Sequence, residues 1–218
     1  MFNLLIFLII TLIGITLYLT YKNKKIPWRF IMIVLIIMIG VLLLLGFRFT
    51  PYSALPTGTK AVKSIDTVYG KAILYEDVNN NTFGLANIHR NIGFLYYDAG
   101  GTSDYFLEGN EPFEAAGIGR DEEDGFIVGV RTRDTNIKYI VVGNHLEKLK
   151  RSDTYSFTMD TVEKYRGSYH LEEVVNNHAL FVLDEYSEAT WTIRALDKDG
   201  HLIADKLFEA GEARYIDW

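Results

Sequence analysis

Hydrophobic positions follow two different patterns along the 218-residue chain. Residues 2–20 and 30–47 are uncharged and would be apolar on every side of a helix, whereas apolar and polar residues alternate from residue 69 onward. A helix rises about 1.5 Å per residue, so about 20 residues cross the hydrocarbon core of a bilayer. The pattern therefore predicts two transmembrane helices, over residues 2–21 and 30–47, followed by a β domain.

Two other interpretations of the apolar segments are weaker. A pair of core helices in a soluble protein is the first, but a soluble core of this size would not require two uninterrupted apolar helices in succession. A cleaved signal peptide would need a basic start and small residues at its cleavage site, but residues 18–21 read Tyr-Leu-Thr-Tyr. We therefore expect both segments to stay in the membrane as a helical hairpin.

The basic loop 22–29 predicts the topology of this hairpin. It carries the cations Lys22, Lys24, Lys25 and Arg29 and the interfacial aromatic residue Trp28. Short loops rich in Lys and Arg stay in the cytoplasm. The protein is therefore predicted to be a two-pass cell-membrane protein with both termini and the C-terminal domain outside. A topology with that domain in the cytoplasm is the alternative.

Charge changes sign where the apolar segments end. The first 65 residues carry seven cations and no Asp or Glu, and the whole chain has a net charge of −6, so residues 66–218 carry −13. We expect a membrane anchor over 1–49, a linker over 50–65 and an extracytoplasmic β domain over 66–218. An acidic domain disfavours a nucleic-acid partner. The absence of Cys excludes disulfides and thiolate metal sites.

Alternation with a period of two dominates the acidic part of the chain. Sparse helical patterns appear only at 145–151 and 171–177. The predicted fold is thus a helical hairpin followed by a mainly antiparallel β domain, as a sandwich, barrel or meander of about nine to eleven strands with one or two short helices. The clearest predicted strands cover 69–76, 82–89, 92–98, 113–119, 126–133, 137–142, 190–196 and 201–208.

Residues 99–106, Ala-Gly-Gly-Thr-Ser-Asp-Tyr-Phe, are predicted to form a loop that contacts a ligand. Two glycines give it freedom, and aromatic rings beside small polar groups suit a sugar or a peptide. The alternative is a long hairpin loop whose aromatic residues pack back on the sheet. The candidate ligand residues are Tyr96, Tyr97, Thr102, Ser103, Asp104, Tyr105 and Phe106.

Other candidate chemistry is weak, and no cofactor, metal site or catalytic residue is predicted. Asp197–Gly200 resembles a fragment of a calcium loop but lacks the further oxygen ligands, so it is interpreted as a hairpin turn. The acidic segment 120–125 is interpreted as a solvated loop, with a cation site as the alternative. The five histidines lack the spacing of a zinc protease, and no G-x-S-x-G elbow occurs. Gly117, Gly119 and Gly129 are expected to mark bulges.

These observations predict a membrane-anchored, outward-facing module without catalytic activity. Its expected partners are the lipid bilayer and an envelope protein, a peptide or a cell-wall glycan. The alternatives are a tethered hydrolase with an unrecognised site and an accessory subunit of a larger membrane complex. In architecture alone, a two-helix anchor with a β-rich outer domain resembles envelope proteins of Gram-positive bacteria, and the resemblance supplies no site residues.

Overall fold

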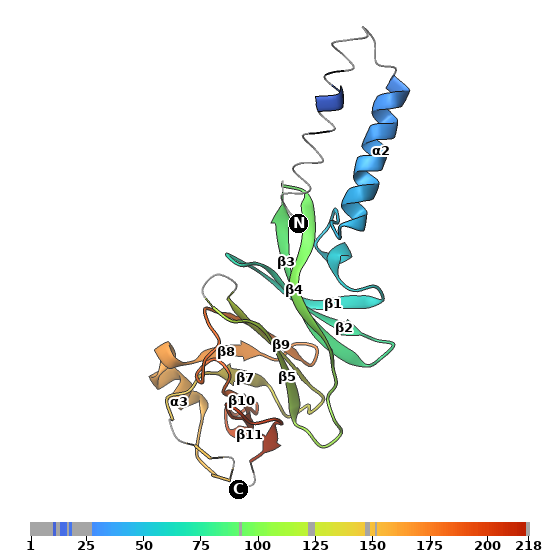
Figure 1. Cartoon of the computed structure of the whole chain (residues 1–218). Helices are drawn as coiled ribbons and strands as arrows, with labels where there is room; N and C mark the ends of the chain where they lie inside the picture. Colours follow the sequence, from blue (N-terminus) through green and yellow to red (C-terminus); the bar gives the residue numbers. More distant parts are fainter. Residues whose placement is uncertain are drawn as a thin grey trace. The chain divides into compact units, whose positions relative to one another are not determined.

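A computed structural model describes residues 11, 14–16, 18, 28–91, 93–121, 125–146, 149–150 and 152–216 (Figure 1). The chain divides into two compact units, Met1–Arg48 and Phe49–Trp218. The second unit is a β domain.

In the first unit, helix α2 spans Trp28–Leu44. It begins two residues before the second apolar segment, 30–47, and covers most of it. Large apolar side chains on it are exposed, among them Ile33, Ile36 and Ile37. Within the described residues, no helix has both the length and the apolar character that crossing a membrane requires. The two predicted transmembrane helices are therefore not confirmed. Most of the first predicted span, together with Lys22, Lys24 and Lys25, lies outside the described residues.

The second unit consists of three antiparallel sheets, which confirms the prediction of a mainly antiparallel β domain with few short helices. In strand order they are β1-β2-β3-β4, β5-β6-β9 and β12-β11-β10-β7-β8. The strand bounds are β1 Thr59–Thr67, β2 Gly70–Asp77, β3 Thr82–Asn91, β4 Leu95–Tyr105, β5 Phe113–Gly119, β6 Phe126–Thr132, β7 Tyr139–Val142, β8 His170–Glu173, β9 His178–Leu183, β10 Ile193–Leu196, β11 Leu202–Lys206 and β12 Arg214–Tyr215.

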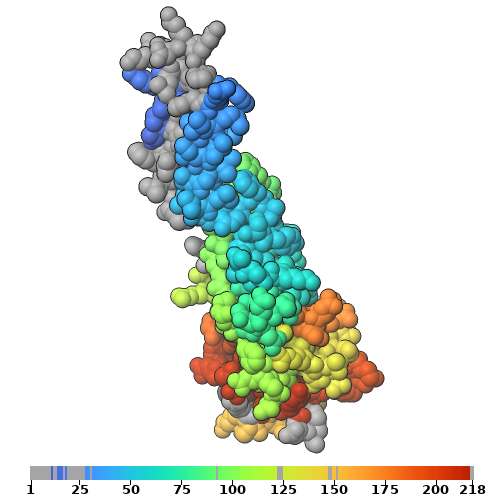
Figure 2. All heavy atoms as spheres, turned by 90° about the vertical axis from the view of Figure 1, so that its right-hand side faces the viewer, coloured from blue at the N-terminus to red at the C-terminus, as the bar shows by residue number. Residues whose placement is uncertain are grey.

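The three-stranded sheet is the middle layer, because both of its faces are buried. One face carries Ala116, Ile127 and Leu180, which pack against Leu74 and Leu85 of the four-stranded sheet. The other face contributes to a core shared with the five-stranded sheet. Strands that are buried on both faces carry continuous runs of apolar residues instead of an alternating pattern. Strands β6 and β9 have such runs. Figure 2 shows the residues of β1–β4 and the residues after 130 in separate parts of the β domain.

Several elements differ from the sequence prediction. The short 3-10 helix η1 (Tyr52–Ala54) forms within the segment expected to be a linker, and strand β1 begins in it and continues to Thr67. The predicted helix 171–177 is wrong, because its first residues form strand β8 beside β7. No described residue of 145–151 is helical. Instead, helix α3 spans Met159–Lys164, and its Val162 packs with Val141 and Leu196 on the outer face of the five-stranded sheet.

The strand glycines serve close packing rather than bulges. The β5–β6 register runs from Phe113 opposite Thr132 to Gly119 opposite Phe126 without a shift, so the predicted bulges are absent from this pair. A Cβ on Gly129 would lie 2.6 Å from Leu85 and 2.8 Å from Leu74. Gly129 therefore lets the middle sheet approach the four-stranded sheet.

Candidate functional site

The segment predicted as a ligand loop is a strand. Residues 96–105 belong to β4, the edge strand of the four-stranded sheet, which pairs with β3 through two irregularities in register. Its aromatic rings split between the two faces of the sheet: Tyr96 packs with Ile73 and Ile88, whereas Tyr105 lies 5.8 Å from Phe83 on the opposite face. The prediction of a loop was wrong, and these aromatic side chains pack back on the sheet.

The remaining predicted ligand residues do not come together in one surface. Ser103 and Asp104 are exposed and hydrogen-bond each other, and the Thr102 carbonyl accepts a hydrogen bond from Tyr75. Phe106 is half exposed, and the Arg133 guanidinium lies 5.9 Å from its ring. These residues therefore offer no common binding surface.

A pocket of about 260 Å³ nevertheless opens beside the two glycines of this segment. Its two walls are cross-strand pairs from different sheets. Asn87 of β3 lies opposite Gly100 of β4, and Ile118 of β5 lies opposite Ile127 of β6. We name this cavity the Asn87 pocket, and its lining residues are Asn87, Ala99, Gly100, Gly101, Ile118, Gly119 and Ile127.

The β4 backbone creates the space in the Asn87 pocket. Ala99 is an extra residue between the pairs Asn87–Gly100 and Ile88–Asp98, so the strand bulges there. Gly100 has no side chain, and a Cβ built on it meets no atom within 4 Å. A side chain at position 100 would therefore enter open space beside Asn87, its partner on β3.

Asn87 gives the pocket its polar group. Phe83, Leu85 and Asn87 alternate along β3, so the asparagine faces the middle sheet like the two apolar residues before it. Its side chain is only 7% exposed, and its Oδ1 has no hydrogen-bond partner among the described residues. Burying an amide oxygen without a donor costs about 1–3 kcal/mol. A packing role alone does not explain an asparagine at this position.

His89 continues the same face of β3 and is also incompletely paired. Its Nε2 is buried without a hydrogen-bond partner in the described part of the chain, and its ring meets Tyr97 edge-on, with centroids 5.7 Å apart. Tyr97, which pairs with His89, therefore lies on this face of the sheet, as does Tyr105 beside Phe83. The lining of the pocket itself contains no ionisable residue.

Sequence reasoning missed Asn87, Ile118 and Ile127. The available signal was a polar residue at an inward position of a strongly apolar strand, Thr82–His89. The isoleucines carried no signal, because their role depends on which sheet faces Asn87.

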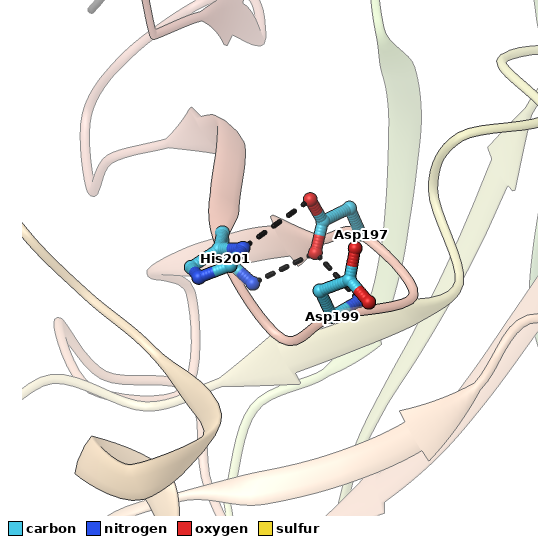
Figure 3. Close-up of side chains that lie close together, drawn as sticks. All are labelled: Asp197, Asp199 and His201. Carbon is cyan, nitrogen blue, oxygen red and sulfur yellow. Dashed lines mark hydrogen bonds and ion pairs between the residues drawn. The ribbon is translucent and has the colours of Figure 1, made fainter.

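The Asp197–Gly200 segment is the predicted hairpin turn, between β10 and β11. The side chains of Asp197, Asp199 and His201 each have an atom that could coordinate a metal ion, and these three atoms lie within 4.8 Å of one another (Figure 3). However, Asp197 Oδ1 accepts the backbone N–H groups of Asp199 and His201, at 2.9 and 2.8 Å. Burial alone would raise the pKa of Asp197, and these hydrogen bonds outweigh it and lower the pKa. The carboxylate therefore closes the turn, which accounts for the cluster without a metal.

A pocket of about 450 Å³ beside this turn is lined by Ser156, Asp197 and His201, the residue types of a nucleophilic hydrolase. The His201 Nδ1 lies 3.6 Å from Asp197 Oδ2. In the described residues, no hydrogen bond joins the Ser156 hydroxyl to His201. The arrangement thus lacks the contact that would activate a serine.

Arg194 of β10, the largest buried polar side chain among the described residues, belongs to the core. Its guanidinium donates to the Tyr155 hydroxyl and to the Gly143 carbonyl, and it lies 4.8 Å from the centre of the Phe157 ring. Arg194 stands between the apolar residues Ile193 and Ala195, in a strand where apolar and polar residues alternate, yet it is fully buried. It therefore holds Gly143 and Tyr155 together beside β10.

The acidic segment 120–125 joins β5 to β6. The Gly125 N–H donates to the Asp121 carbonyl at 2.7 Å, and residues 122–124 lie outside the described residues.

Comparison of the chain with protein-family models, with curated proteins and with solved structures finds no match.

Proposed function

We propose that this protein is a membrane-anchored binding module whose β domain faces outward and takes a ligand in the Asn87 pocket. The observation that carries the proposal is a pocket without charged lining whose polar side chain, Asn87, is buried and has no partner for its Oδ1 among the described residues. Such a site suits recognition of a neutral ligand. It offers no acid, base or nucleophile for a reaction.

The exposed surface of α2 supports the anchor. Ile33, Ile36 and Ile37 are each more than half exposed. Removing an isoleucine side chain from water stabilises it by about 1.5–3 kcal/mol, so this surface favours an apolar surrounding. Lipid is the proposed surrounding, since residues 2–20 and 30–47 are both uncharged.

The outward orientation is supported by the cations of the loop 22–29. Trp28 and Arg29 are exposed at the start of α2, as expected for residues at a membrane interface. With this loop in the cytoplasm, both termini and the β domain lie outside. The partners proposed are the bilayer and a component of the cell envelope.

Protease treatment of intact cells that express the full chain tests this orientation. External protease is expected to remove an epitope at the C-terminus while a cytoplasmic control protein stays whole. An epitope that survives until the cells are lysed would overturn the outward orientation.

Binding is tested with the full chain in detergent and isolated cell envelopes. Retention of the wild-type chain on the envelopes is expected, and it should fall when Gly100→Val fills the Asn87 pocket. Equal retention of the two chains would contradict a function of this pocket.

A further inference from the structure

The Asn87 pocket restricts the chemistry of its ligand. Its lining contains one amide side chain, glycine backbone and two isoleucines, and none of the lining residues is ionisable. A charged ligand would lose its hydration there without gaining a countercharge. The ligand is therefore neutral and combines a polar group for Asn87 with an apolar group for Ile118 and Ile127.

Asn87 defines the polar group further. An amide side chain offers one carbonyl acceptor and an NH₂ donor, and rotation about its last bond exchanges their positions. Oδ1 lies against Gly70 of β2, where a built Cβ would come within 2.5 Å of it, and it has no donor there among the described residues. Turning it toward β4 and the pocket therefore breaks no hydrogen bond of the oxygen with these residues. After this turn a ligand N–H can gain the acceptor, and the amide NH₂ takes the place of Oδ1 beside Gly70.

We infer that the Asn87 pocket binds the acetamido group of an N-acetylated sugar, an inference that rests on the proposed function and names the ligand class of its site. The acetamido N–H donates to the Asn87 carbonyl. The acetyl methyl contacts Ile118 and Ile127 on the opposite wall. With about 260 Å³, the pocket is smaller than the 300–1,000 Å³ typical of drug-sized ligands, as expected for one substituted ring of a longer glycan.

The geometry of β4 disfavours a peptide as the occupant. A peptide that adds to the sheet edge needs a regular row of backbone groups along β4. The extra residue Ala99 and the second irregularity between Phe83 and Leu85 on the paired strand interrupt this row. Bulges of this kind protect sheet edges against strand addition.

Calorimetric titration of the full chain in detergent tests the inference. The probes are N-acetylglucosamine and its β-1,4-linked disaccharide, with glucose and glucosamine as probes that lack the acetyl group. The wild-type chain is expected to bind the two acetylated sugars. Glucose and glucosamine should bind at least about tenfold more weakly, the equivalent of one lost hydrogen bond.

Two variants test the site from its opposite sides. Gly100→Val fills the pocket from β4, where a Cβ meets no atom within 4 Å, and Asn87→Leu removes the amide from β3. Both are expected to weaken binding of the acetylated disaccharide at least about tenfold. Gly109→Val is the matched control, because Gly109 also has no atom within 4 Å of a built Cβ and lies outside the pocket. Thermal unfolding of each variant shows that it is folded.

The outcomes separate the ligand class from the proposed function. Envelope retention that depends on Gly100, without binding of acetylated sugars, overturns the acetamido inference and leaves the binding module standing. Binding of glucose as tight as that of N-acetylglucosamine, or binding of the disaccharide that Gly100→Val leaves unchanged, also overturns it. Loss of both envelope retention and sugar binding in the wild-type chain contradicts the two proposals together.

Discussion

The Tyr155 hydroxyl bridges two buried ionic groups: it accepts a hydrogen bond from Arg194 Nε at 2.9 Å and donates one to Asp205 Oδ2 at 3.0 Å. Burial raises the pKa of Tyr155, which keeps the hydroxyl protonated and able to donate. Asp205 also pairs with Arg214 at 2.8 Å. One phenol thus ties strands β10, β11 and β12 to the loop that precedes α3.

Tyr155→Phe is expected to lower the free energy of unfolding by about 2–4 kcal/mol, because Arg194 and Asp205 each lose a buried partner. Urea denaturation followed by fluorescence measures the change. Tyr186→Phe is the matched control, since Tyr186 is 46% exposed. That variant should differ from wild type by less than about 0.5 kcal/mol. Equal stability of Tyr155→Phe and wild type would show that the bridge contributes nothing.

Gly129→Ala is expected to destabilise the β domain by about 1–3 kcal/mol, the usual cost of overpacking a core. The new methyl would lie 2.6 Å from Leu85 Cδ2. Because Leu85 is the obstacle, Leu85→Val in the Gly129→Ala background should cost less than Leu85→Val alone. Denaturation of the four chains of this double-mutant cycle gives the coupling. Additive effects would contradict direct contact between the sheets at Gly129.

His178 is expected to make stability depend on pH. It is 2% exposed, and burial lowers its pKa although Glu76 lies 3.3 Å from Nε2. An unfolded histidine has a pKa of about 6.5, so below this pH the unfolded chain binds the proton more readily than the folded chain. The stability from neutral His178 is therefore present above about pH 6.5 and is lost as the pH falls toward the folded pKa.

Urea denaturation midpoints measured between about pH 8 and 5 test whether stability falls on acidification. His178→Gln should reduce the loss of stability on acidification, and His170→Gln, a substitution of an exposed histidine in β8, serves as its control. A loss of stability on acidification as large in His178→Gln as in wild type would exclude His178 as the source.

Ile36→Lys is expected to weaken membrane attachment. Ile36 is 62% exposed near the middle of α2, and a lysine at the centre of a membrane helix costs about 2.5–3.5 kcal/mol. Alkaline carbonate extraction followed by sedimentation should find more of this variant in the soluble fraction. Val68→Lys places the same charge at a 93% exposed site in the β domain and should leave the chain in the pellet. Full extraction of the wild-type chain would overturn the anchor.

Calcium at millimolar concentration is expected to leave the melting temperature unchanged, because the backbone of the turn already occupies Asp197 Oδ1. Differential scanning calorimetry with and without the ion measures this. A rise in the melting temperature that Asp199→Asn abolishes would establish a cation site at the turn.

The local pattern of the sequence was sufficient to predict strands that pair with the next strand along the chain. Strand β5 has the predicted bounds, and the hairpin of β10 and β11 closes at the predicted turn. Alternation and turn residues act over a few positions, so they can be read without knowing the fold. The same patterns failed for β8, whose short Leu-Glu-Glu sequence forms a strand only because β7 lies beside it.

Only the tertiary structure decided which face of each strand is buried and where space remains. Arg194 has the position of a solvent-facing residue in an alternating strand, but it is fully buried and binds Gly143 and Tyr155. The Asn87 pocket exists because a glycine in β4 faces two isoleucines more than fifteen residues away in another sheet. Burial of this kind depends on contacts between distant segments, and no local period in the sequence records them.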